Sequence, residues 1–154
     1  MIITLGRQHG SNGHDIARAL AKELDYKCFD KEIVDEAAEN SHFSKEIFDS
    51  YDEKRVNTYI VPVPHYVGMN EGFRLNMQVA TAQFDVMRLL AEKGNCIFVG
   101  RCADYILKDR PDCLHIFIHS DMAHRAARVR ERYGETSKPM EKRLQEKDSK
   151  RKVY

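Results

Sequence analysis

The first twenty residues, MIITLGRQHGSNGHDIARAL (Met1–Leu20), decide the fold class. Met1–Leu5 is a continuous apolar run that ends at Gly6, which is typical of a buried strand. From His14 to Leu24 the apolar residues recur at helical spacing (Ile16, Ala17, Leu20, Ala21 and Leu24). The chain therefore opens with a strand, a glycine-rich loop and a helix.

The composition describes one globular domain. The 154 residues are 42% hydrophobic and 32% charged, and the net charge of +1 gives no overall basic field for nucleic acid. No apolar run reaches membrane-spanning length, and the N-terminus lacks the pattern of a signal peptide. The cysteines have no CxxC spacing and lie mostly in apolar runs (Cys28, Cys96, Cys102 and Cys113). We predict a reduced, cytoplasmic, single-domain protein whose partner is neither nucleic acid nor membrane.

Further strands and helices alternate along the rest of the chain. Strands are predicted over Lys27–Phe29, Cys96–Gly100 and Leu114–Ile118. Helices are predicted over Lys31–Asn40, Ser44–Val56, Phe73–Lys93, Asp121–Tyr133 and Met140–Tyr154, with an irregular segment over 57–72. The alternation predicts βαβ units and a parallel sheet, which bind ligands at the carboxyl ends of their strands. Attention therefore falls on Gly6–His14, Asp30, Gly100–Asp104 and His119–Asp121.

The glycine-rich loop has two of the features of a phosphate cradle. Gly10 and Gly13 let backbone amides converge, and a helix begins near His14. The GxxxxGK[ST] pattern is not met. If Gly10 and Ser11 are matched to the inner Gly-Ser of GxxGSGK, Asn12 takes the next glycine and Gly13 takes the lysine. These residues alone leave a phosphate loop and a plain strand–turn–helix both open.

The order of motifs along the chain resembles the cytidylate kinase-like family of P-loop nucleoside monophosphate kinases. The longest stretch is VGRCADYILKDRPDCLHIFIHSDMAHRAARVRERYG (Val99–Gly134). The opening carries R-x-x-G-S-x-G followed by Asp15-Ile16-Ala17. Phe29-Asp30-Lys31-Glu32 and Lys147–Arg151 add to the match, which covers nearly the whole chain in the right order.

The resemblance implies a three-layer α/β fold, in which a parallel sheet is flanked by helices, and phosphoryl transfer from ATP·Mg²⁺ to CMP or dCMP. It implies a mobile acceptor-binding flap, placed over 57–72, and an arginine-bearing lid, placed over 125–140. The triphosphate cradle corresponds to Gly10, Ser11, Asn12, Gly13 and His14. The acceptor side corresponds to Asp30 and Arg101, with Asp104 as a looser match. The lid and the D-x-x-R element after it (Asp148 to Arg151) supply the catalytic arginines Arg125, Arg128, Arg132 and Arg151.

Arginine suits this chemistry because its fork binds phosphate oxygens in pairs, and a lid excludes water that would otherwise accept the phosphoryl group. The chain departs from the well-studied kinases in two ways. The cradle lysine is missing, and we expect Arg7 to replace it, because a guanidinium is always charged whereas His14 at a helix N-terminus tends to stay neutral. Only four strands can be counted before Tyr154, so we expect the last strand of the family fold to be missing.

Simpler interpretations stay open beside these. Arg125, Arg128 and Arg132 have the spacing of a solvated helix face. His115 and His119 suit a packed or edge position better than a metal site, and Asp30 could cap the following helix. The alternative functions are a non-catalytic nucleotide-binding module, favoured by the missing lysine, and a kinase for another small acceptor.

Overall fold

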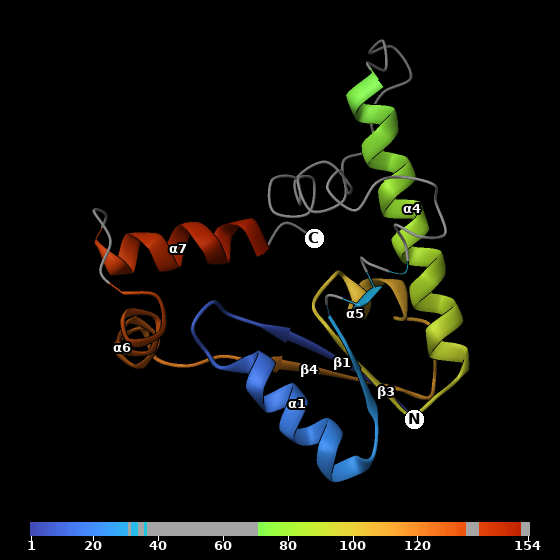
Figure 1. Ribbon diagram of the computed structural model, residues 1–154, viewed down its shortest axis with the longest axis horizontal. Coiled ribbons are helices and arrows are strands. Elements are labelled where there is room, and N and C mark those ends of the chain that lie inside the picture. Colours follow the sequence, from blue (N-terminus) through green and yellow to red (C-terminus); the bar gives the residue numbers. More distant parts are fainter. Residues whose placement is uncertain (31, 34–35, 37–70, 135–138, 152–154) are drawn as a thin grey trace.

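The computed structural model describes residues 1–30, 32–33, 36, 71–134 and 139–151 (Figure 1). Its helices and strands follow one another in the order β1 (Ile2–Arg7), α1 (Gly13–Leu24), β2 (Lys27–Phe29), α4 (Glu71–Glu92), β3 (Cys96–Val99), α5 (Ala103–Ile106), β4 (Cys113–Ile118), α6 (Met122–Tyr133) and α7 (Met140–Arg151). No helix in these described ranges has both the length and the apolar character needed to cross a membrane.

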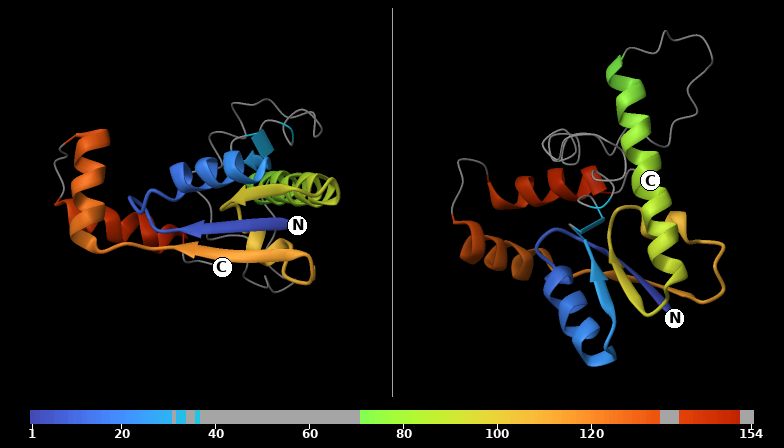
Figure 2. Two further views of the ribbon diagram at one scale, coloured as in Figure 1. Left: turned by 90° about the horizontal axis from the view of Figure 1, so that it is seen from below. Right: turned by 45° about the vertical axis from the view of Figure 1, so that its right-hand side comes forward.

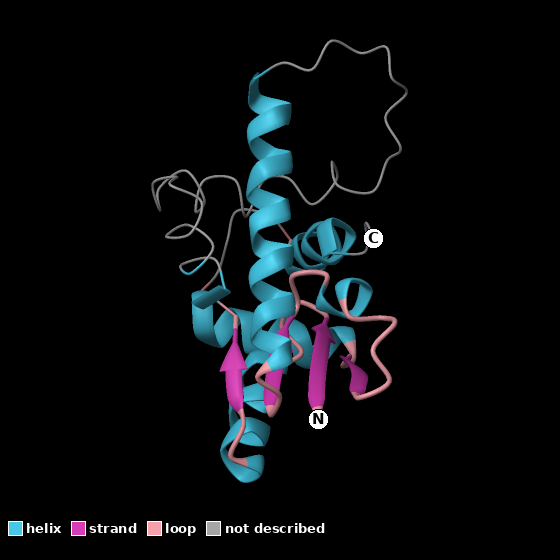
Figure 3. Ribbon diagram, turned by 90° about the vertical axis from the view of Figure 1, so that its right-hand side faces the viewer, coloured by secondary structure: helices cyan, strands magenta, loops and turns pink. Residues whose placement is uncertain are grey.

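The strands form one parallel sheet in the order β2-β3-β1-β4. All four point the same way in Figure 3, so their carboxyl ends meet at one edge. Ile2 on β1 is aligned with Cys96 on β3 and with Cys113 on β4. Because β1 lies inside the sheet, the loop that follows it emerges between the ends of β3 and β4.

Alternate residues of the strands build a core on each face of the sheet. On one face, Ile2 and Phe98 pack with Met87 and Leu90 of α4. On the other face, apolar side chains of β1 and β3 pack with Ala17 and Ala21 of α1 (Ile3, Leu5, Ile97 and Val99). The predicted three-layer α/β fold with a parallel sheet is therefore confirmed.

Several element boundaries differ from those predicted. The first strand does not end at Leu5: it continues to Arg7, because Gly6 pairs with Phe117 and Arg7 with Ile118 on β4. The apolar pattern could not show this, since the extension is stabilised by backbone pairing. The short helix α5 was not predicted.

Other predictions fall partly outside the described residues. Of the helices predicted over Lys31–Asn40 and Ser44–Val56, only Glu32, Ile33 and Glu36 are described, and all three are helical. The predicted flap also lies outside, except that residues 71 and 72 form the start of α4. Residues 135–138 of the predicted lid are not described, and its described part consists of the end of α6 and the start of α7.

Helices α6 and α7 lie beyond the carboxyl ends of β1 and β4 (Figures 1 and 2). They are packed together by a small apolar cluster of Val129 on α6 with Met140 and Leu144 on α7. Gly10 in the loop after β1 contacts this pair directly: a Cβ there would lie 2.9 Å from Cγ2 of Val129 and 3.0 Å from the carbonyl oxygen of Arg125. The loop is therefore enclosed between the sheet and α6.

Replacing Gly10 with alanine tests this packing. Gly10 has φ +80, and the added methyl group meets atoms closer than normal contact, whereas Gly94 has φ +67 with open space around it. Gly94→Ala should therefore lower the free energy of unfolding by about 1–2 kcal/mol, from backbone strain alone. Gly10→Ala should lower the free energy of unfolding by roughly 1–3 kcal/mol more, because it also overpacks the contact with α6. Urea unfolding of both variants measures the difference, and equal losses would contradict the packing.

Candidate functional site

The loop Gln8–Asn12 is held in a conformation that needs residues tolerant of positive φ. Gly10 has φ +80 and Asn12 has φ +67, and Asn is one of the few residues besides Gly that adopt this region readily. Asn12 is the residue that the sequence aligned with a glycine of the phosphate loop. The backbone geometry thus explains why Asn can stand at this position.

Ser11 stabilises the loop from within. It is 4% exposed, and its hydroxyl donates to the carbonyl oxygen of Gln8 at 2.9 Å. Gln8 in turn ties the loop to the end of β4: its N–H donates to the carbonyl of Ile118 (3.0 Å), and its Oε1 accepts from the N–H of Ser120 (3.2 Å). The Ser11 side chain therefore shapes the turn, and Gln8 fixes the loop to the end of β4.

Helix α1 begins at Gly13 and presents an uncapped N-terminus. Asn12 precedes it without a side-chain capping hydrogen bond. The amides of a first helical turn have no acceptor within the helix, and the helix dipole there favours a negative charge. These are the requirements of an anion-binding helix N-terminus.

The side chain of Arg7 occupies the space beside Gly13. A Cβ at Gly13 would lie 2.6 Å from Cβ and 2.9 Å from Cγ of Arg7. The guanidinium continues over Gly100, where a Cβ would overlap Nη1 of Arg7. A lysine at position 13 is thus excluded while Arg7 keeps this conformation, and a cation from the end of β1 lies beside the position that aligns with the lysine of the GxxxxGK[ST] pattern.

Asp30, just after β2, joins two of the predicted site residues. Its Oδ1 lies 3.7 Å from Nη2 of Arg7, and its Oδ2 lies 3.1 Å from Nδ1 of His14. All three side chains are partly exposed. The structure therefore brings Arg7, His14 and Asp30 together at the start of α1.

A cavity of about 200 Å³ lies next to this cluster, at the carboxyl ends of β1, β3 and β4. Its charged lining combines two arginines with two carboxylates. The lining residues are Gly6, Arg7, Gln8, Gly100, Asp104, Phe117, Asp148 and Arg151. The edge of the sheet that parallel topology predicts as a ligand site is thus hollowed and lined by charged groups.

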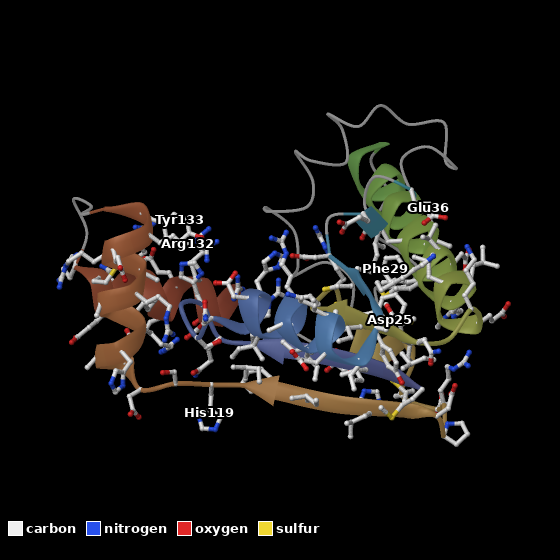
Figure 4. All side chains as sticks on the ribbon, turned by 60° about the horizontal axis from the view of Figure 1, so that its bottom comes forward. Asp25, Phe29, Glu36, His119, Arg132 and Tyr133 are labelled. Atoms are coloured by element: carbon white, nitrogen blue, oxygen red, sulfur yellow. The ribbon has the colours of Figure 1, made fainter. Side chains whose placement is uncertain are left out.

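The arginines of α6 contact the loop and α1. Arg125 is 4% exposed, and its Nη1 donates to the carbonyl oxygen of His9 (3.2 Å) and pairs with Oδ2 of Asp148 on α7. Arg128 donates to the carbonyl oxygen of Gly10 at 2.8 Å. Arg132 forms an exposed ion pair with Asp15 on α1 at 3.1 Å, and Figure 4 shows it on the side of α6 that faces α1. The alternative of a solvated helix face is therefore wrong for Arg125.

Comparison with known proteins agrees with this geometry. The model of the cytidylate kinase-like family matches residues 2–154. The chain belongs to the cytidylate kinase-like family. A crystal structure of an uncharacterized protein from Eubacterium ventriosum ATCC 27560 is 33% identical, with a TM-score of 0.68 over 100% of this chain and 76% of that one. The comparison with curated proteins found no match.

The site of this cytidylate kinase-like chain joins some predicted residues and separates others. Arg7, Asp104 and Arg151 share the cavity, whereas Arg132 lies on α6 against α1. Arg101 has φ +59 at the turn between β3 and α5 and does not line the cavity. Sequence reasoning missed Gln8 and Phe117 as lining residues. A signal existed for Phe117, because strand alternation placed it on the face opposite to Ile116 and Ile118.

Other candidate chemistry finds no support in the described residues. No group of three His, Cys, Asp or Glu side chains among them is placed to hold a metal ion. His115 accepts or donates a hydrogen bond with Thr4 Oγ1 at 2.7 Å, and His119 points away from α6 and α7 (Figure 4). Burial raises the pKa of Cys102 to about 12, which leaves it an unreactive thiol.

His9 lies in a positive and partly buried environment. Burial, and then the charges of Arg151, Lys147 and Arg143, lower the pKa of His9 from 6.5 to about 4. Its ring stacks on that of Tyr133 at 6.3 Å. Nε2 of His9 is buried without a hydrogen-bond partner in the described part of the chain. His9 is therefore neutral at pH 7 and adds no positive charge to the loop.

The low pKa of His9 predicts a pH dependence of stability. Between pH 6.5 and 4 the unfolded chain binds a proton at His9 that the folded chain does not, so the free energy of unfolding falls as the pH falls through this window. Above pH 6.5 His9 contributes no such dependence. His9→Gln should remove this component from urea unfolding curves recorded between pH 4 and 7. A native-state NMR titration that places the pKa of His9 near 6.5 would contradict the burial.

Proposed function

We propose that this chain transfers the γ-phosphoryl group of ATP to a nucleoside monophosphate, with CMP or dCMP as the acceptor. The observation that carries the proposal is the juxtaposition at one sheet edge of an uncapped helix N-terminus and a cavity lined by two arginines. Phosphoryl transfer of this kind forms no intermediate on the protein. It requires two anions to be positioned in line and their charge neutralised.

The donor phosphates are assigned to the loop and the first turn of α1. Amides of Gly13 and His14 belong to that turn, and the carbonyls of His9 and Gly10 are taken up by arginines of α6. Arg7 lies against Gly13 and supplies the charge that lysine gives in other P-loop kinases. Mg²⁺ enters with ATP on the phosphate oxygens, which is its usual mode in kinases.

The acceptor is assigned to the cavity and to Asp30. Arg151 supplies positive charge for the acceptor phosphate, and Asp104 supplies an acceptor for sugar or base donors. Arg7 borders both sides, because its stem touches Gly13 while its guanidinium lies over Gly100 and near Asp30. A phosphate that binds there competes with Asp30 for the guanidinium.

A second function, nucleotide binding without catalysis, is favoured by a specific observation. Arg125 and Arg128 are engaged by His9, Asp148 and Gly10, so these two arginines are not directed at a transferring phosphate. Under the kinase proposal, Arg7 and Arg151, which line the cavity, are assigned to transition-state charge. The two functions differ in whether bound ATP turns over.

A panel of acceptors tests the proposed function. The chain is supplied with ATP·Mg²⁺ and each of CMP, dCMP, UMP, AMP, GMP and shikimate, and ADP formation is followed in a coupled assay. We expect ADP release above the rate with water as acceptor, highest with CMP or dCMP. Nucleotide binding by calorimetry without turnover for any monophosphate would support the binding module instead. Turnover confined to shikimate would assign the site to another class of acceptor.

Removing the Arg7 side chain tests its assigned role. A charged hydrogen bond contributes about 1.5–3 kcal/mol, so Arg7→Ala should raise KM for ATP roughly tenfold to a hundredfold. KM for the acceptor should change much less. Arg18→Ala, which removes the same charge from an exposed position on α1, is the matched control and should behave like the wild type. An equal rise in both KM values on Arg7→Ala would contradict a role on the ATP side.

A further inference from the structure

Both backbone polar groups of His9 are bound by side chains from distant helices. The N–H of His9 donates to Oδ1 of Asp148 at 2.7 Å, and its carbonyl oxygen accepts from Nη1 of Arg125 at 3.2 Å. The same Nη1 pairs with Oδ2 of Asp148, which closes a ring of three groups. Arg125 is 4% exposed and Asp148 is 8% exposed. The ring is therefore shielded from water. Charged hydrogen bonds are stronger in such a buried environment than in water.

The carbonyl groups on either side of His9 are also bound by arginines. Arg128 donates to the carbonyl of Gly10 at 2.8 Å, and Arg151 donates to that of Arg7 at 3.5 Å. A phosphate is attracted by backbone N–H groups and repelled by carbonyl oxygens. Arginines that bind these three carbonyls turn their negative ends toward α6 and α7 and neutralise them. Because the amides of Gln8, His9 and Ser11 already have acceptors within the protein, an anion is left to the amides of the first turn of α1.

The position of Asp148 depends on how α7 is docked. Met140 and Leu144 pack on Val129 of α6, and Asp148 follows Leu144 by one turn of the same helix. Gly10 lies directly on Val129 and on the carbonyl of Arg125. The loop, α6 and α7 are therefore one packed unit, in which a shift of α7 withdraws a partner from His9.

We propose that Arg125 and Asp148 are positioning residues that hold the glycine loop in its phosphate-binding conformation from behind, so that affinity for the triphosphate depends on the docking of α7. This rests on the proposed function in one respect, the assignment of ATP to the loop. Neither side chain contacts the nucleotide in this role. Asp148 lines the cavity, but both of its carboxylate oxygens are engaged by the ring.

The test uses a double-mutant cycle of Asp148→Asn and Arg125→Met, with binding of ATP that carries a fluorescent N-methylanthraniloyl group as the readout. Each single variant should weaken binding about tenfold or more, because it leaves a buried partner unpaired. The double variant should bind the analogue with an affinity no lower than that of the weaker-binding single variant, because the ring acts as a unit. Asp112→Asn is the matched control. It breaks an exposed Arg–Asp pair (3.0 Å) just before β4, at the opposite end of the sheet, and should leave affinity unchanged.

Two further readouts separate this role from the alternatives. In the kinase assay, the single variants should raise KM for ATP and leave KM for the acceptor within about twofold; a rise confined to the acceptor would show that Asp148 binds substrate and would overturn the proposal. Hydrogen exchange of amides 8–12 should accelerate in both single variants while the sheet stays protected, whether or not nucleotide binds. Unchanged loop exchange, or additive losses of affinity in the cycle, would also overturn it.

The outcomes distinguish this proposal from the proposed function. If the chain binds the fluorescent ATP analogue but transfers no phosphoryl group, the proposed kinase activity is wrong and the proposed coupling between the loop and α7 still stands. A wild-type chain that fails to bind the analogue overturns the nucleotide assignment, and hydrogen exchange still decides whether Arg125 and Asp148 position the loop. If Arg125→Met fails to fold by circular dichroism, Asp148→Asn, which keeps the side-chain shape and an oxygen acceptor, decides on its own.

Discussion

The contact between the side-chain stem of Arg7 and the Cα of Gly13 determines the shape of the candidate site. No Cβ fits at position 13 while Arg7 runs beside it, so the residue that is lysine in most P-loops has to be glycine here. The contact also directs the guanidinium over Gly100 and toward Asp30. One arginine at the end of β1 thereby accounts for two glycines and one carboxylate that are far apart in the sequence.

The fold places this contact between two supports. Because β1 is an inner strand of a parallel sheet, its loop emerges among the ends of β3 and β4, where the N–H of Gly100 donates to Leu5 and the side chain of Gln8 accepts from Ser120. On the outer side, Arg125 and Arg128 of α6 bind carbonyl groups of the loop, and Asp148 of α7 accepts from the N–H of His9. The loop is fixed on both sides, and the first turn of α1 is left to meet an anion.

The fold was predictable to the extent that it depends on hydrophobic pattern. All four strands and the long helices α1, α4 and α6 appear close to their expected bounds, because the spacing of their apolar residues identifies their buried faces. The extension of β1 to Arg7 and the single turn of α5 were not predictable, because backbone pairing and turn geometry determine them. The family followed from the order of its motifs.

The sequence identified individual residues of the candidate site, but it did not predict which of these residues contact one another. Arg7 and Asp30 were each identified from position after a strand, and the structure joins them. Arg125 shares a helical stripe with Arg128 and Arg132, and nothing in that spacing marks it as buried. Its burial depends on Asp148, a partner 23 residues away that reaches it only once α7 packs on α6. Long-range pairing of charges is the information that one sequence lacks.

Whether Arg7 takes the place of the loop lysine is tested most directly by removing Arg7 and introducing a lysine at position 13. The measurement is the affinity for ATP of the double variant Arg7→Gly/Gly13→Lys, compared with Arg7→Gly and with Gly13→Lys alone. Glycine is used at position 7 because the nearest atom to a Cβ at position 13 is Cβ of Arg7, at 2.6 Å, which alanine would keep. Its removal opens the space at position 13, so the double variant should bind ATP more tightly than Arg7→Gly. Gly13→Lys alone should be impaired by the clash. A double variant no better than Arg7→Gly, together with a Gly13→Lys variant that behaves as the wild type, would contradict the exchange of lysine for Arg7.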